Sequence, residues 1–152
     1  MRIALGSDLS CELTDALARQ LRERGAEPVL FGALDPKADD SWPSVGRAVG
    51  EAVACGDCVQ GILCCWTGTG VSIAANKVRG DRAALCNDAE TARGARRWND
   101  ANVLALSIRS VTPAIAGEML DAWFAAAPAD DAAERAMIDS LKAMDADVTR
   151  RG

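Results

Sequence analysis

The stretch that decides the fold of this chain is Gly61-Ile-Leu-Cys-Cys-Trp-Thr-Gly-Thr-Gly-Val-Ser-Ile-Ala-Ala-Asn-Lys77. Its first five residues, Gly61–Cys65, form a continuous apolar run that is typical of a buried strand in a parallel sheet. A glycine-rich turn at 66–70 follows, and Val71–Val78 has the pattern of a short helix. A strand that passes through such a turn into a helix is the building unit of α/β folds.

The same alternation continues on both sides of this stretch. We expect strands at Arg2–Gly6, Glu27–Phe31, Arg82–Cys86 and Asn102–Leu106, and helices at Cys11–Arg24, Val45–Ala54, Asp88–Arg97, Thr112–Phe124 and Asp130–Ala146. The segment Asp35–Ser44, rich in Asp, Pro and Ser, is expected to be a loop. The order predicts one α/β domain, residues 1–152, with a parallel sheet wrapped by helices.

Composition argues against several classes of function. The chain has 152 residues and a net charge of -5, which disfavours nucleic acid and anionic membranes as partners. No segment has the roughly 18 consecutive apolar residues of a membrane span, and the N-terminus has the pattern of a strand rather than of a signal peptide. Six cysteines in a helix-rich chain favour reduced thiols in the cytoplasm.

Proton-transfer chemistry is limited by two missing residue types. The chain has no His and no Tyr, so Cys, Asp, Glu, Lys or a hydroxyl must supply any acid or base. Cys65 ends the buried strand and is expected to face a helix N-terminus, where a thiol is partly ionised. A thiolate can remove a proton from a carbon next to a carbonyl, and the turn can stabilise the oxyanion that forms. Strand alternation predicts that Cys64 points the other way, into the core.

Several motifs at consistent spacing resemble the ribose-5-phosphate isomerase B/galactose-6-phosphate isomerase (LacA/LacB) family. They cover residues 2–125 and comprise segment 61–77 with Arg79-Gly80, Arg82-Ala83 and Cys86, the opening Ile3-Ala4-Leu5-Gly6-Ser7-Asp8, the later Trp98-Asn99-Asp100-Ala101-Asn102-Val103-Leu104-Ala105, and Asp121-Ala122-Trp123. The resemblance implies a Rossmann-like three-layer α/β/α sandwich with a mostly parallel five-stranded sheet. It implies an aldose–ketose isomerase of phosphorylated sugars that works through a cis-enediol, with no metal or other cofactor.

The resemblance also implies an assembly and a set of site residues. The assembly is a homodimer or homotetramer with sites between subunits, and the C-terminal helix, about 130–146, is expected to pack on a partner. Cys65 matches the catalytic cysteine and Thr67 the threonine beside it. By this resemblance the expected substrate-binding residues are Asp8, Gly68, Thr69, Gly70, Asn99, Arg109 and Arg135. Residues 68–70 form the anion hole, Arg109 matches a phosphate-binding arginine, and Arg135 matches one of two phosphate-binding arginines that the family places a helical turn apart near the C-terminus. Trp66 and Trp98 flank the presumed pocket, so we expect them to line it as substrate-binding walls.

The chain departs from the family's pattern where the family has histidines. Leu9 and Trp98 stand at two of these positions, and the family's Asp-Tyr-Pro-His loop is Ser41-Trp42-Pro43-Ser44 here. In the family, the histidine at the position of Trp98 helps to open the sugar ring. One interpretation is a substrate without a ring, such as an erythrulose phosphate, because a tetrose phosphorylated on O4 cannot close a furanose. Other interpretations are a pocket reshaped by Trp98 for another sugar, or lost activity.

Other functions and simpler roles stay open at this point. The chain could be an epimerase, or a sugar-phosphate-binding or partner subunit without catalysis. Cys65 could be an ordinary buried thiol, Asp8 a helix cap and Arg109 a surface ion-pair partner. Cys55 and Cys58 have the spacing of a redox or zinc pair, but the pair closes a helix and lacks a second pair of ligands.

Overall fold

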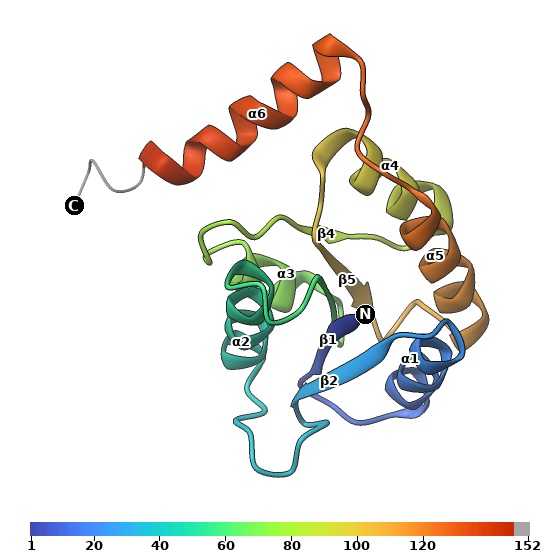
Figure 1. Cartoon of the computed structure of the whole chain (residues 1–152). Coiled ribbons are helices and arrows are strands. Elements are labelled where there is room, and N and C mark those ends of the chain that lie inside the picture. The colour runs from blue at the N-terminus through green and yellow to red at the C-terminus, as the bar shows by residue number, and fades with distance from the viewer. Residues whose placement is uncertain (148–152) are drawn as a thin grey trace.

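Five parallel strands form the middle layer of the computed structural model, which describes residues 1–147 (Figure 1). They are β1 (Arg2–Ser7), β2 (Glu27–Gly32), β3 (Gln60–Cys65), β4 (Ala83–Leu85) and β5 (Val103–Ser107). Their order in the sheet is β2-β1-β3-β5-β4, and each neighbouring pair is parallel. The expected parallel five-stranded sheet is therefore confirmed.

The helices form the two outer layers. They are α1 (Glu12–Glu23), α2 (Trp42–Ala54), α3 (Thr69–Ala75), α4 (Ala89–Asn99), α5 (Pro113–Ala125) and α6 (Ala132–Asp147). Figure 1 shows α1, α4 and α5 on one side of the sheet and α2 and α3 on the other, which confirms the three-layer α/β/α sandwich. α6 contacts α4, and its second half reaches Asp100 through Lys142 and the N–H of Gly80 through Asp145.

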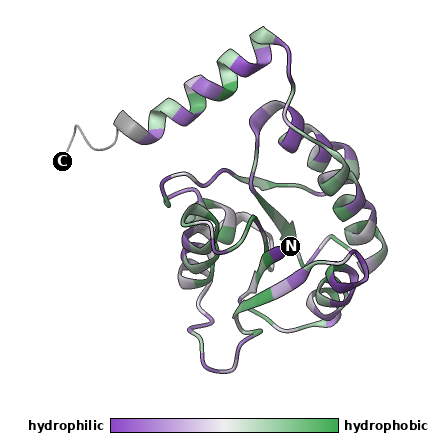
Figure 2. Ribbon diagram, viewed as in Figure 1, coloured by the Kyte–Doolittle hydropathy of each residue, from purple (hydrophilic) through white to green (hydrophobic). Residues whose placement is uncertain are grey.

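Strand alternation divides the core between the two faces of the sheet. Ile62, Cys64 and Leu104 pack with the side chains of α1, α4 and α5, whereas Leu63 and Cys65 pack with those of α2 and α3. Figure 2 shows hydrophobic residues along the strands and mixed character on the helices. Fully burying an aliphatic side chain contributes about 1.5–3 kcal/mol, so the alternation fixes which face each strand residue occupies. The predicted opposition of Cys64 and Cys65 is confirmed.

Two expected helices have wrong boundaries. α2 begins at Trp42 rather than at Val45, because Pro43 suits a first helical turn and Ser41 takes the extended conformation of an N-cap. The loop expected to reach Ser44 therefore ends before Trp42. α3 spans Thr69–Ala75 instead of 71–78, because Gly68 already adopts the N-cap position of this helix.

The last helix is expected at 130–146. α6 begins at Ala132 and ends at Asp147, so its bounds differ from the expectation by two residues and one residue. Residues 148–152 of the expected single domain lie outside the described part. None of the helices within 1–147 combines the length and hydropathy needed to cross a bilayer.

Candidate active site

The carboxyl ends of three central strands bring part of the predicted site together. Asp8 directly follows β1, and Cys65 is the last residue of β3. The register places Ser7 beside Cys64, and Cys65 beside Ser107 at the end of β5. Because ligands of open α/β sheets bind at the carboxyl ends of the strands, this edge is the candidate active site.

Hydrogen bonds hold the chain in place just beyond Cys65. The main-chain N–H groups of Ile108 and Arg109 donate to the carbonyl oxygens of Cys65 and Trp66, each over 3.0 Å. The Ser107 hydroxyl donates to the Trp66 carbonyl, also over 3.0 Å. These bonds extend the β3–β5 pairing into the turn, so the backbone that leaves Cys65 has a defined direction. The Trp66 side chain itself is exposed, at 59%.

The glycine-rich turn is shaped by Gly68. This residue has φ 75 and ψ -13, and its N–H donates to the Cys65 carbonyl over 3.2 Å. The hydroxyls of Thr67 and Thr69 lie 2.7 Å apart, and both residues are exposed. Thr69 and Gly70 start α3, so their N–H groups lack acceptors within the helix. The turn therefore presents donors and hydroxyls beside Cys65.

Alanine at Gly68 is expected to destabilise the protein and to distort this turn. A Cβ at Gly68 would lie 2.9 Å from the carbonyl carbon and oxygen of Leu106, which is a steric clash. The left-handed backbone adds a cost of about 1–2 kcal/mol for any non-glycine residue. Gly80→Ala is a matched control, because Gly80 has φ 86 but a Cβ there would meet only the Cβ of Ala54, at 3.9 Å. Denaturant unfolding should show the larger loss for Gly68→Ala. Equal losses would contradict the close approach to β5.

Cys65 and Cys64 differ in their surroundings. Cys65 is 5% exposed and lies on the face that is covered by α2 and α3, whereas Cys64 is fully buried on the other face. Burial raises the pKa of the Cys64 thiol far above its ordinary range. Cys65 is therefore the member of the pair that lies on the same side of the sheet as α3.

Asp8 has an unsatisfied oxygen at the strand edge. Its Oδ1 is buried and has no hydrogen-bond partner within the described residues. Burial, with a smaller contribution from Asp40, raises the pKa of Asp8 despite a hydrogen bond from its own backbone. Buried polar atoms normally have partners, so this oxygen is available to a ligand hydroxyl.

The remaining predicted residues lie elsewhere in this chain. Trp98 and Asn99, at the end of α4, line a cavity of about 520 Å³ beside β4. Arg109 lines a separate cavity of about 300 Å³ near the start of α1, and Arg135 is exposed on α6. The structure thus brings together Asp8 and residues 65–70, and it places the other four side chains outside that group.

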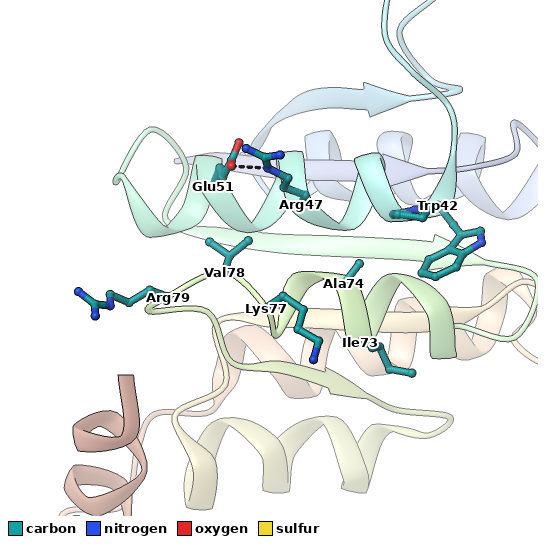
Figure 3. Close-up of a pocket in the computed structure, with 9 residues that line it drawn as sticks. Trp42, Arg47, Glu51, Ile73, Ala74, Lys77, Val78 and Arg79 are labelled. Atoms are coloured by element: carbon teal, nitrogen blue, oxygen red, sulfur yellow. Dashed lines mark hydrogen bonds and ion pairs between the residues drawn. The ribbon is translucent and has the colours of Figure 1, made fainter. Parts of the chain in front are cut away.

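Trp42 is a site residue that sequence reasoning missed. A Cβ at Gly70 would lie 2.9 Å from its indole ring, so the ring covers the turn at the start of α3. Trp42 also lines a groove of about 560 Å³ between α2 and α3, where Figure 3 shows it at one end and Arg79 at the other. Pro43 was the available signal, because proline in a first helical turn would have placed Trp42 at a helix start.

The described residues hold no group of three or more His, Cys, Asp and Glu side chains arranged for a metal ion. All six cysteines are free, with Cys55 exposed and Cys58 buried.

Comparisons with known proteins agree with one another. The family model described as Ribose/Galactose Isomerase matches residues 3–141. Ribose-5-phosphate isomerase B of Escherichia coli is 40% identical over 126 residues, covering 82% of this chain and 84% of that protein. A D-erythrulose-4-phosphate isomerase of Pectobacterium atrosepticum is 36% identical over 125 residues, covering 81% and 82%. The solved ribose-5-phosphate isomerase B of Clostridium thermocellum has a TM-score of 0.87 and 36% identity, covering 97% of this chain and 99% of that one.

Proposed function

This chain belongs to the ribose/galactose isomerase family, and from that premise we propose that it interconverts the aldose and ketose forms of a phosphorylated sugar. The observation that carries the proposal is the arrangement at the end of β3. Cys65 is followed by exposed Thr67 and by a turn in which Gly68 opens α3. This arrangement supplies a base and hydrogen-bond donors in adjacent positions, as a cis-enediol mechanism requires.

In the proposed reaction Cys65 moves one proton between neighbouring carbons. Its thiolate removes the proton from the carbon next to the carbonyl, and the electron pair forms an enediolate. The N–H groups at the start of α3 and the Thr67 hydroxyl stabilise the negative oxygen. The thiol then returns the proton to the former carbonyl carbon, while a proton moves between the two oxygens. Substrate and product are isomers, so the reaction consumes no cofactor.

We further propose that two copies of the chain complete each site. Trp98, Asn99 and Arg109 lie outside the group around Cys65, so a second copy would bring its own Trp98–Asn99 segment to that group. Met137, Leu141 and Met144 are exposed on α6, and we propose that this face packs on the partner subunit. A homodimer or homotetramer with sites between subunits is the resulting assembly. Free thiols and a sugar-phosphate substrate fit a cytoplasmic location.

The substrate that we propose is an open-chain, four-carbon sugar phosphate. The chain has no histidine with which to open a ring, and the exposed Trp98 indole stands where the family has its ring-opening histidine. The similarity to a protein named D-erythrulose-4-phosphate isomerase supports this choice. A second candidate, a five-carbon substrate, is favoured by the similarity to ribose-5-phosphate isomerase B.

Initial-rate measurements on the two substrates should separate these candidates. We expect kcat/KM for D-erythrulose 4-phosphate to exceed that for ribose 5-phosphate by about 10²-fold, the usual contribution of one acid–base group. Ribose 5-phosphate exists mostly in the ring form, which this chain has no imidazole to open. A preference for the pentose would contradict the four-carbon proposal. If the protein turns over neither compound, the result favours a sugar-phosphate-binding role without catalysis. Exchange of solvent deuterium with inversion but no carbonyl migration would indicate an epimerase.

A further inference from the structure

Asp100 has a strained backbone immediately after Asn99. Its φ is 45 and its ψ is 42, and it is the only non-glycine residue with positive φ in the described part of the chain. Such a conformation costs about 1–3 kcal/mol and persists only where the surroundings enforce it. The strain falls at the C-cap of α4, directly beside the predicted substrate-binding residue Asn99.

The Asp100 carboxylate binds three cations, from α4, from α6 and from the segment before β4. Its oxygens lie 3.2 Å from Arg82 Nη2, 3.4 Å from Arg96 Nη1 and 2.6 Å from Lys142 Nζ. Arg82 precedes β4, Arg96 is on α4 and Lys142 is on α6. The side chains of Asp100 and Arg82 are only 17% exposed. Ion pairs of this kind, partly withdrawn from water, are stronger than exposed ones.

Main-chain hydrogen bonds join the same residues to the loop around them. Arg82 Nε donates to the Asp100 carbonyl over 2.7 Å, and Arg96 Nη1 donates to the Ala101 carbonyl over 2.6 Å. Asn102 accepts from the Arg82 N–H over 2.7 Å and donates to the Gly80 carbonyl over 2.9 Å. The end of α4 is therefore tied to the segment before β4 through both side chains and backbone.

We propose that Asp100 is a positioning residue of the isomerase, an inference that rests on the proposed function. It fixes Asn99 at the end of α4 through Arg82 and Arg96, and through Lys142 it holds α6, which carries Arg135. Asn99 is exposed and lines two cavities, one that also includes Arg82 and one that also includes Trp98. Arg135 lies less than two helical turns from Lys142. One carboxylate thereby couples two predicted substrate-binding residues, Asn99 and Arg135.

Two substitutions separate these connections. Asp100→Asn removes the charge while keeping a residue that tolerates the left-handed backbone. We expect kcat to fall about 10–100-fold, because displacement of a positioning group by about 1 Å costs up to 10²-fold. KM should also rise several-fold, because this substitution breaks the ion pair with Lys142 too. Lys142→Met removes only the connection to α6, so we expect KM to rise several-fold while kcat changes little. Glu23→Gln, which breaks an exposed ion pair with Arg19 on α1, is the control and should change neither constant.

A structural readout tests the coupling without relying on turnover. Hydrogen exchange of the full-length protein should become faster at both 98–103 and α6 in Asp100→Asn, but only at α6 in Lys142→Met. Asp100→Gly keeps the backbone conformation without strain, and we expect it to lose kcat as Asp100→Asn does. If Asp100→Asn fails to fold, the glycine and Lys142→Met variants decide the question.

The outcomes distinguish this inference from the function on which it rests. Unchanged kcat and unchanged exchange at 98–103 in the Asp100 variants would overturn the positioning role. Identical kinetic effects of the Asp100 and Lys142 substitutions would also overturn it, because the two connections would then not be separable. If the wild-type protein isomerises no sugar phosphate, the proposed function fails. The exchange pattern would then still confirm or overturn the role of Asp100 in holding both segments.

Discussion

Replacing Cys65 by alanine is expected to reduce kcat/KM about 10³-fold, in the middle of the range for loss of a general base. The reason is chemical, because no imidazole or phenol is available in this chain to take over the proton. The substitution removes only the sulfur atom of a side chain that is nearly buried, at 5% exposure. We therefore expect a folded protein that binds substrate. Initial rates and incorporation of solvent deuterium into the substrate measure the loss.

Cys64→Ala is the matched control for this experiment. The two residues are neighbours on β3 but lie on opposite faces of the sheet, and Cys64 is fully buried. Its loss should lower the free energy of unfolding by about 1 kcal/mol, as small deletions in cores do, and leave the rate of proton exchange near that of the wild type. Retained exchange in Cys65→Ala, or equal loss in both variants, would rule out Cys65 as the base.

Asp81→Asn is expected to stabilise the protein above neutral pH by up to about 4 kcal/mol. Asp81 is 6% exposed, and neither carboxylate oxygen has a hydrogen-bond partner among residues 1–147. Its Oδ2 lies against α2, 2.8 Å from the position that a Cβ atom would occupy at Gly50. Burial raises the pKa of Asp81 to about 7, and the negative charge of Asp145 adds to the rise while Arg82 opposes it.

The sign of the pH dependence follows from this raised pKa. The unfolded chain has the ordinary value of 3.8, so the folded protein binds more protons between pH 4 and 7. Stability therefore falls as pH rises through that window, and the full penalty is present above pH 7. Asparagine carries no such charge, so the variant should match the wild type near pH 4 and exceed it at pH 8.

Denaturant unfolding at a series of pH values measures this effect. Asp139→Asn, at an exposed position on α6, is the control and should leave the pH profile of the wild type unchanged. If the stability difference between Asp81→Asn and the wild type does not increase from pH 4 to pH 8, the buried ionisation of Asp81 is contradicted.

The sequence by itself determined the fold class and the central part of the candidate site. Residues 61–70 contain an apolar run that ends in Cys65, followed by Gly68 and Gly70, so the strand, the turn and the helix start follow from neighbouring residues. The period of two along a strand also determined that Cys64 and Cys65 occupy opposite faces. Features of this kind depend on local geometry and on burial of apolar surface, and both are readable from adjacent positions.

The contacts between distant residues follow from how the elements pack. The strand order β2-β1-β3-β5-β4 places Asp8 beside the end of β3, and the packing of α2 on α3 places Trp42 against Gly70. The convergence of Arg82 and Lys142 on Asp100 likewise has no sequence pattern. These contacts join residues far apart in the chain, so they depend on how whole elements cross and pack. No local propensity encodes that choice.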